Sequence, residues 1–282
     1  MLEWWNSVYL LVISLLYKSW TGLLIPLLVF TTLALLVKRK RVLQNSSETF
    51  SESVFNFLMM NVNAVIVIPI IIWLSPYISN HLWVLFDMSE LNPFLCGVLA
   101  LFWGDFVGYW RHRFEHIRWL WPSHATHHSD VNMSWLTLER FHPINRLTTF
   151  IIDSTLLLII GFPPFAIITT NLIRHYYGYF IHADLPWTYG RFGQWFVSPV
   201  MHKWHHANVL RAYKSNFATV FSFYDRLFGT YYMPGMCTVA LGVDGLSKRS
   251  LLYHLTYPFI ISNYQKVDQH SKTSVEPKKS QQ

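Results

Sequence analysis

Histidine is concentrated at three places in this sequence, and the spacing inside each group is that of a helix face. Eight of the 14 histidines belong to these groups, which are one HxxxH pair and two HxxHH triplets: His112 and His116; His124, His127 and His128; His202, His205 and His206. Residues three and four apart lie on one face of a helix. An HxxxH pair can therefore hold one metal ion, and an HxxHH triplet can present three imidazoles to a site that holds two.

A ninth histidine, His182, lies between the second and third groups and is added to the candidate ligands. A lone histidine is more often a surface or hydrogen-bonded core residue, and His81, His254 and His270 are assigned to that class. Nearby arginines and aromatic residues would also suit a lipid-binding surface. That alternative explains the arginines, but it does not explain two identical HxxHH spacings, whereas histidine is the commonest metal ligand.

The number and type of candidate ligands restrict the metal without naming it. A structural zinc ion closes its site with four ligands, often including cysteine. Here at least eight imidazoles are available, and neither Cys96 nor Cys237 is near them. Imidazole suits Zn, Cu, Fe and Ni alike. Residue types alone therefore predict two metal ions and leave both two zinc and two iron ions open.

Neutral imidazoles leave the charge of two divalent ions uncompensated, so carboxylates are expected to accept hydrogen bonds from the outer ring nitrogens. Asp105 lies seven residues before His112, two turns away on the same helix face. An acid deep in an apolar span is costly unless it has a partner, so Asp105 is the preferred candidate. Glu115, Asp130 and Asp225 are the further candidates.

The composition indicates a membrane protein. Hydrophobic residues make up 52% of the 282 positions and charged residues only 13%, about half the usual charged share of a soluble domain. The net charge of +7 is interpreted as membrane topology and headgroup attraction rather than nucleic-acid binding. Two cysteines cannot form a disulfide framework. The start of the chain lacks the basic region of a cleavable signal peptide, so the first apolar segments are expected to remain.

Three segments are long and apolar enough to span a bilayer. The first, 20–37, ends on four basic residues at 38–41, which mark the cytoplasmic side. The second, 54–74, leads to a loop with Asp87 and Glu90, and the third, 93–110, returns to arginines at 111, 113 and 118. Residues 8–17 are too few to span; they either lie in the interface or extend the first span.

The segment 147–173 is interrupted by Gly161-Phe-Pro-Pro164, a helix-breaking turn signal. The arm before it, 147–160, reaches only about 21 Å, less than the roughly 30 Å of the hydrocarbon core. We therefore predict a membrane hairpin, which keeps all histidine groups on the cytoplasmic face. The predicted organisation is membrane spans in 1–110, a histidine-bearing catalytic region in 111–240, a closing helix in 241–264 and a disordered polar tail in 265–282.

These motifs resemble those of the fatty acid hydroxylase/sterol desaturase superfamily of membrane-bound di-iron enzymes. The likeness runs from about residue 95 to residue 234, and it rests on the three histidine groups, on Glu139-Arg-Phe-His-Pro143 and on Tyr224-Asp-Arg-Leu-Phe-Gly-Thr-Tyr231. It is closest to the sterol desaturase-like branch that includes alkylglycerol monooxygenase-like proteins. The resemblance implies an all-α multi-pass helical bundle with a cytosolic histidine-rich cap, two non-haem iron ions, O₂ as co-substrate, and hydroxylation or desaturation of a sterol, fatty acyl or ether lipid.

One position departs from the family pattern. Fatty acid 2-hydroxylases have a histidine four residues before the equivalent of His182, where this chain has Gly178. His175, seven residues before, is left as a possible tenth ligand. Arg113 and Arg140 are weak candidates for a lipid headgroup site, with ordinary positive-inside residues as the alternative. No catalytic residue beyond the metal ligands is predicted.

An unactivated C–H bond requires a metal–oxygen oxidant, so the metal supplies the chemistry and the protein supplies placement. The sequence contains no dinucleotide fingerprint, P-loop or cysteine cluster. The electrons are therefore expected from a separate ferredoxin- or cytochrome b5-type protein with its reductase. The expected location is a bacterial inner membrane or the endoplasmic reticulum, with the site on the cytoplasmic face. A two-zinc hydrolase and a membrane protein that binds or transports metal are the competing functions.

Overall fold

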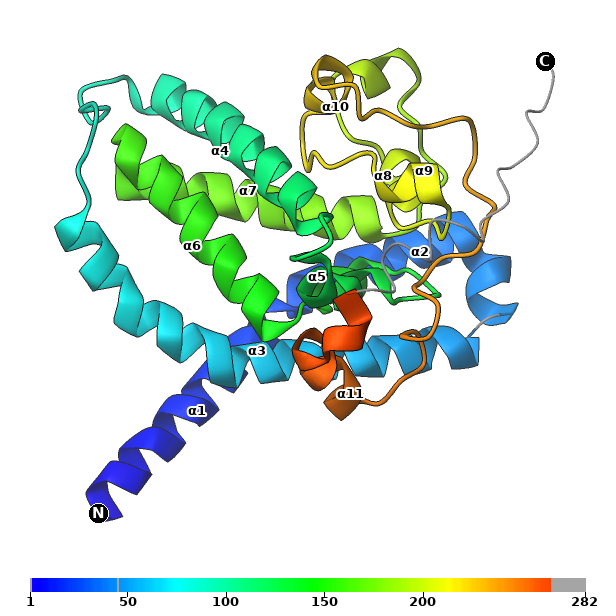
Figure 1. The fold of residues 1–282 in the computed structure, drawn as a ribbon, viewed down its shortest axis with the longest axis horizontal. Coiled ribbons are helices and arrows are strands. Elements are labelled where there is room, and N and C mark those ends of the chain that lie inside the picture. Colours follow the sequence, from blue (N-terminus) through cyan, green and yellow to red (C-terminus); the bar gives the residue numbers. More distant parts are fainter. Residues whose placement is uncertain (1, 45, 265–282) are drawn as a thin grey trace.

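A computed structural model describes residues 2–44 and 46–264, and these residues form helices without a single named strand (Figure 1). The prediction of an all-α fold is confirmed. The predicted tail, 265–282, lies outside the described residues. The α-helices are α1 (Leu2–Gly22), α2 (Leu24–Gln44), α3 (Ser46–His81), α4 (Pro93–Glu115), α5 (Trp121–His128), α6 (Pro143–Ile160), α7 (Pro164–His182), α8 (Pro199–His205), α9 (Leu210–Tyr213), α10 (Phe223–Leu227) and α11 (Leu251–Thr256).

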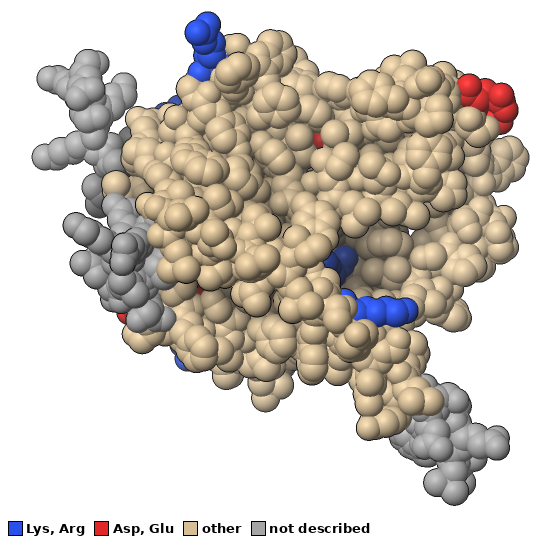
Figure 2. All heavy atoms as spheres, turned by 180° about the vertical axis from the view of Figure 1, so that it is seen from behind, with Lys and Arg blue, Asp and Glu red and all other residues tan. Residues whose placement is uncertain are grey.

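Four helical stretches within the described residues are long and apolar enough to cross a membrane: Tyr9–Val37, Ser47–His81, Pro93–Glu115 and Pro143–Ile160. The first three contain the three predicted spans. Residues 9–17 belong to the first stretch, which favours an extended first span over a separate interfacial helix. Large apolar side chains such as Leu28, Leu36 and Trp73 are more than 70% exposed along these helices. Figure 2 shows a broad face with few charged side chains, as a lipid-facing surface requires.

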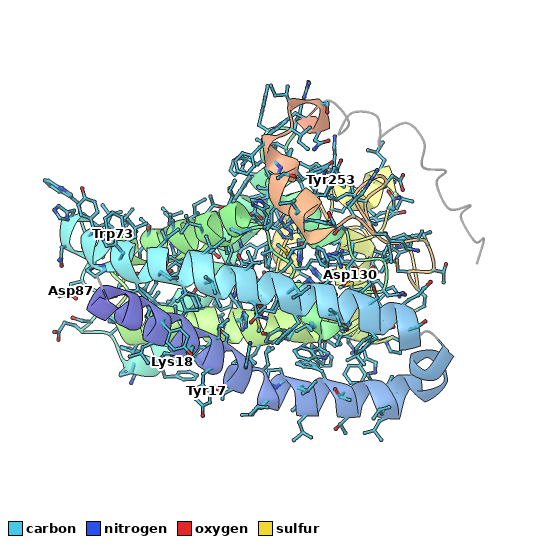
Figure 3. All side chains as sticks on the ribbon, turned by 90° about the horizontal axis from the view of Figure 1, so that it is seen from below. Tyr17, Lys18, Trp73, Asp87, Asp130 and Tyr253 are labelled. Atoms are coloured by element: carbon cyan, nitrogen blue, oxygen red, sulfur yellow. The ribbon has the colours of Figure 1, made fainter. Side chains whose placement is uncertain are left out.

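The long helices place the histidine-bearing region at one end of the molecule. Helices α4, α6 and α7 form a layer beside α3, while the short helices α8, α9 and α10 gather on one side of α4 (Figure 1), and α10 packs against Phe102 and Phe106 in the middle of α4. Asp87, in the loop between α3 and α4, lies at the opposite end from Asp130, which follows α5 (Figure 3). The acidic loop and the histidine groups are therefore separated by the length of the helical layer.

Helices α6 and α7 leave the histidine region and return to it. Gly161 ends α6 with φ of +100°, a backbone conformation that favours glycine. Its carbonyl accepts a hydrogen bond from Met88 N, and Ile159 O accepts one from Leu85 N, so the turn lies against the loop between α3 and α4. The outward arm is thus the 18-residue helix α6, which begins four residues before the predicted arm. The turn between α6 and α7 therefore lies at the same end of the helical layer as the loop between α3 and α4, so the α6–α7 pair extends along the full layer and is longer than a short re-entrant hairpin.

Buried ion pairs join α4, α6 and α7 inside this layer. Asp153 of α6 accepts hydrogen bonds at 2.7 Å from both Arg111 Nε of α4 and Arg174 Nη1 of α7. Arg174 also lies 3.4 Å from Asp105, and Arg111 donates to Glu115 at 2.7 Å. Charges in an apolar layer are stable only when paired, so these contacts fix how the three helices pack.

The closing segment differs from the predicted single helix. Helix α11 covers only Leu251–Thr256 and is followed by a 3₁₀ turn at Tyr257–Phe259. Pro258 explains the early end, because proline has no N–H to continue the α-helical ladder. Within this segment His254 is fully buried against Phe55 and Thr126, the structural role expected for it.

Candidate metal centre

The structure brings all nine candidate histidines together in two adjacent groups. Within each group the candidate ligand atoms lie within 4.8 Å of one another, and every residue is buried. The five-histidine group contains His112, His116, His124, His128 and His205, and the four-histidine group contains His127, His182, His202 and His206. The rings of His128 and His206 stack with centroids 4.4 Å apart and join the two groups.

Short helices aim these side chains inward. Pro122 and Pro199 occupy the first turns of α5 and α8, where proline is favoured because its missing N–H would have no helical partner. Each triplet sits on a helix of only about two turns and extends to its end, with His206 as the C-cap of α8.

The outer ring nitrogens of several histidines are fixed by acceptors from the surrounding chain. His112 Nδ1 lies 2.8 Å from Phe217 O, His205 Nδ1 lies 2.6 Å from Ser215 O, and His182 Nδ1 lies 2.7 Å from Gly178 O. A carbonyl oxygen only accepts, so each of these Nδ1 atoms carries the proton. The Nε2 lone pairs of these rings consequently point into the group.

These lone pairs face one another at short distance. The Nε2 atoms of His112 and His205 are 3.0 Å apart, although both rings have their proton on Nδ1. No hydrogen bond can form between two lone pairs, and their repulsion requires a cation between them. Two imidazole nitrogens at about 2.1 Å from one metal ion and at right angles would lie about 3.0 Å apart. The geometry and donor set thus fit a metal ion.

Burial keeps the histidines in their neutral, ligating form. It lowers the pKa of His124 and of His205 to about 3, and that of His182 to about 4. Burial, followed by repulsion from neighbouring imidazoles, lowers the pKa well below its usual value at five other positions: His116, His127, His128, His202 and His206. Among the described residues, neither ring nitrogen of His116 or of His206 has a hydrogen-bond partner, a costly arrangement unless a ligand occupies the site.

The preferred carboxylate, Asp105, does not contact a candidate ligand. Its oxygens accept from Val220 N and Phe221 N at 2.8–3.1 Å, and it pairs with Arg174. Seven residues correspond to about 10 Å along a helix, too far for contact with His112. Among the other candidates, Asp225 accepts from Ala218 N, which belongs to the same peptide unit as the Phe217 carbonyl that fixes His112.

Glu115 is the predicted carboxylate that does reach a histidine. Its Oε2 lies 3.4 Å from His124 Nδ1, and its Oε1 accepts from Asn145 Nδ2 at 2.7 Å. Asn145 Oδ1 lies 3.2 Å from the same His124 nitrogen. Asn145 is absent from the predicted site; its place two residues after His142-Pro143, at the start of α6, is the only sequence signal for it. Asp130 instead accepts from Asn56 and Thr137, outside the groups.

His175 belongs to neither histidine group. Its Nε2 lies 3.6 Å from Glu139 Oε1, in the wall of the adjoining cavity. Gly178, at the position where fatty acid 2-hydroxylases have histidine, contributes its carbonyl to His182. A side chain there would press on Leu138, since an added Cβ lies 3.0 Å from it.

The two arginines predicted as weak candidates for a lipid headgroup site, Arg140 and Arg113, differ in burial and in their contacts. Arg140 is 1% exposed; it pairs with Glu52 and donates to Ser129 Oγ and Asn56 Oδ1. It therefore joins α3 to the histidine region and cannot meet a lipid headgroup. Arg113 is half-buried, donates to Tyr109 and stacks over Trp110.

A cavity of about 530 Å³ reaches the histidines from the side of the candidate spans, and we call it the span-side cavity. Residues from α1, α3, α4, α6 and α7 line it, including Lys18, Ala64 and Leu172. Five candidate ligands form its inner end: His112, His124, His127, His182 and His202. Figure 2 shows a hollow on this face of the molecule with cationic side chains in it and at its rim.

Comparison with known proteins gives the same family as the motifs. Residues 97–230 match the fatty acid hydroxylase family model. The chain is similar to ornithine lipid hydroxylase OlsE of Rhizobium tropici, with 28% identity over 57% of this chain and 50% of that protein. It is also similar to alkylglycerol monooxygenase of Danio rerio, with 29% identity over 69% of this chain and 44% of that protein. A third relative is very-long-chain aldehyde decarbonylase GL1-11 of Oryza sativa subsp. indica, with 30% identity over 45% of this chain and 48% of that protein.

These matches cover only about half the length of each of the three relatives. No solved structure matches this chain.

Proposed function

Residues 97–230 of this chain belong to the fatty acid hydroxylase family, and from this premise we propose that the protein is a membrane-embedded di-iron enzyme that uses O₂ to hydroxylate or desaturate a lipid. The observation that carries the proposal is the pair of buried histidine groups whose neutral nitrogens face one another. When bound, two ferrous ions would supply the O₂-derived oxidant that an unactivated C–H bond requires.

Each histidine group would hold one ion. The five-histidine group offers more ligands than a structural zinc site uses, and all nine ligands are neutral imidazoles, which suit iron. The surrounding residues hold the rings in place. The carbonyls of Phe217, Ser215 and Gly178 fix three tautomers, and Glu115 with Asn145 orients His124. Glu115 also places one negative charge beside the centre.

The span-side cavity is the proposed lipid site. Its walls toward the spans are apolar, with Ala64, Val67 and Ile68 of α3 opposite Leu172 of α7. Its inner end meets the histidines together with Arg111, Asp153 and Arg174. A lipid chain would lie along the apolar walls, and the bond to be oxidised would lie at the histidine end. Relatives that act on an ornithine lipid and on alkylglycerols are consistent with a lipid substrate.

The remaining parts of the proposal are carried over from the sequence. Electrons would come from a separate ferredoxin- or cytochrome b5-type protein with its reductase. The enzyme would reside in a bacterial inner membrane or the endoplasmic reticulum, with its centre on the cytoplasmic face. The four regions predicted from the sequence remain its proposed organisation, with α6–α7 as the membrane hairpin.

Cysteine labelling tests the proposed topology. Single cysteines at Trp119 and Leu227, each 69% exposed, should be labelled from the cytoplasmic side, because one hairpin returns the chain between them. A cysteine at Trp83, 89% exposed in the acidic loop, should be labelled only from the opposite side. All three are placed in a background lacking Cys96 and Cys237. Labelling of Trp119→Cys and Leu227→Cys from opposite sides would contradict the hairpin.

Metal analysis and lipidomics test the function itself. The purified protein should contain about two iron ions per chain. Cells that express it should accumulate a lipid that is heavier by one oxygen or lighter by two hydrogens, and the Asn145→Ala variant should accumulate less. Two zinc ions with a hydrolysed lipid would support the two-zinc hydrolase instead. Metal uptake without any lipid change would support the transporter.

A further inference from the structure

A second cavity reaches the histidines from the opposite side. It measures about 470 Å³, and we call it the cap-side cavity. Three candidate ligands line it: His116, His128 and His206. No described residue lines both cavities, and the five histidines of the span-side cavity are all different from these three. The two histidine groups therefore form a partition between two separate approaches.

The two cavities differ in their relation to the candidate spans. The span-side cavity takes residues from all four of the apolar stretches. The cap-side cavity takes only Arg113 from such a stretch, at the C-terminal end of α4. Its other walls come from the turn after α4, from α5, and from the segments around α9 and Val243. The second approach therefore opens outside the apolar layer, toward water.

The charges of the two cavities differ as well. The span-side cavity combines cations with three acids, Glu115, Glu139 and Asp153. The cap-side cavity has Arg113, Arg118 and Lys214 in its wall, and among its described lining residues none is acidic. Asp244 accepts a hydrogen bond from Asn208 but does not itself line the cavity. Clefts lined by charges of one sign concentrate ions of the opposite sign.

The apolar part of the wall suits an organic molecule. Trp121 and Tyr213 stack edge-to-face with centroids 4.2 Å apart, and both contact His116 at 5.0–5.1 Å. Ile117, Val209 and Val243 complete the apolar wall. A volume of 470 Å³ lies within the usual range of small-molecule sites, about 300–1,000 Å³. A few convergent cations in an apolar cavity are the usual composition of a site for a small anion.

We propose that the cap-side cavity is a separate site for a small water-soluble organic anion, which binds beside His116, His128 and His206 while the lipid occupies the span-side cavity. The inference rests on the proposed function only for the lipid and for the role of these histidines as ligands. The anion site itself depends on the shape and charge of the cavity, so it can be tested without measuring oxygenase activity.

Charged thiol reagents test this proposal directly. A single cysteine at Val209, in a background lacking Cys96 and Cys237, is treated with the anionic ethylsulfonate and the cationic ethyltrimethylammonium methanethiosulfonate. The comparison position is a single cysteine at exposed Met236. We expect the modification rate with the anionic reagent, divided by that with the cationic reagent, to be about tenfold higher at Val209 than at Met236. Lys214→Gln should lower the ratio, as should high salt. The matched control is Arg211→Gln, because Arg211 is an exposed neighbouring cation that does not line the cavity.

Protection experiments identify the class of ligand. Citrate, used as the probe anion, should slow modification at Val209 and leave Met236 unaffected. Equal rate ratios at the two positions, or a ratio that Lys214→Gln leaves unchanged, would overturn the proposal. Protection by an acidic redox protein but not by citrate would also overturn it, and would assign the face to protein docking. None of these readouts requires oxygenase activity, so their failure would leave the proposed lipid oxidation standing.

Discussion

Alanine at His112 or at His127 is expected to remove about one metal ion per chain and to abolish lipid oxidation. The two residues belong to different histidine groups, so each variant should lose a different ion and retain the other. Loss of residues that only orient a ligand typically costs 10–100-fold in affinity or activity, and loss of a ligand itself should cost more. The measurements are metal content of the purified variants and product formation in cells.

Two further substitutions serve as controls for this prediction. His81 is exposed and far from the groups in sequence, and His175 lines the span-side cavity without joining either group. His81→Ala should leave both the metal content and product formation unchanged. His175→Ala should keep both metal ions, even if lipid turnover changes. A His112→Ala protein that retains two ions and full activity would remove the five-histidine group from the mechanism.

Replacing Asp153 with alanine should be the most destabilising single change among the ion pairs of the helical layer. Asp153 is 4% exposed and accepts from two arginines on two other helices. Its loss leaves Arg111 with Glu115 and Arg174 with a longer contact to Asp105. Breaking a buried ion pair typically costs about 3–5 kcal/mol because a charge is left without its partner. The measurement is the free energy of unfolding in mixed micelles.

The comparison variant for this prediction is Asp87→Ala. Asp87 is exposed in the loop before α4, and within the described part of the chain its carboxylate accepts hydrogen bonds only from neighbouring Ser89. It should therefore change the free energy of unfolding by less than about 0.5 kcal/mol. If both variants were equally stable, the ion pairs of α4, α6 and α7 would not be what holds these helices together.

The sequence determined the parts of this protein that depend on local spacing. The three spans follow from apolar runs of sufficient length, and the candidate ligands follow from intervals of three and four residues on a helix. The turn at Gly161-Phe-Pro-Pro164 is equally local, because glycine and proline restrict the backbone wherever they stand. The predicted depth of the hairpin was too small, since proline at 143 allows α6 to begin earlier than the apolar run suggests.

Tertiary structure alone decided how the histidines are shared. In each triplet the first and last residues enter one group and the middle residue enters the other: His124 and His128 are separated from His127, and His202 and His206 from His205. Residues four apart differ by about 40° around a helix, whereas adjacent residues differ by about 100°, so a triplet must present two directions. Which direction meets which partner depends on the packing of α4, α5, α7 and α8. The partners of Asp105 were also decided by tertiary structure, since Val220 and Phe221 are more than 100 residues away in the sequence. A local sequence pattern cannot indicate which distant backbone amides will donate to an acid.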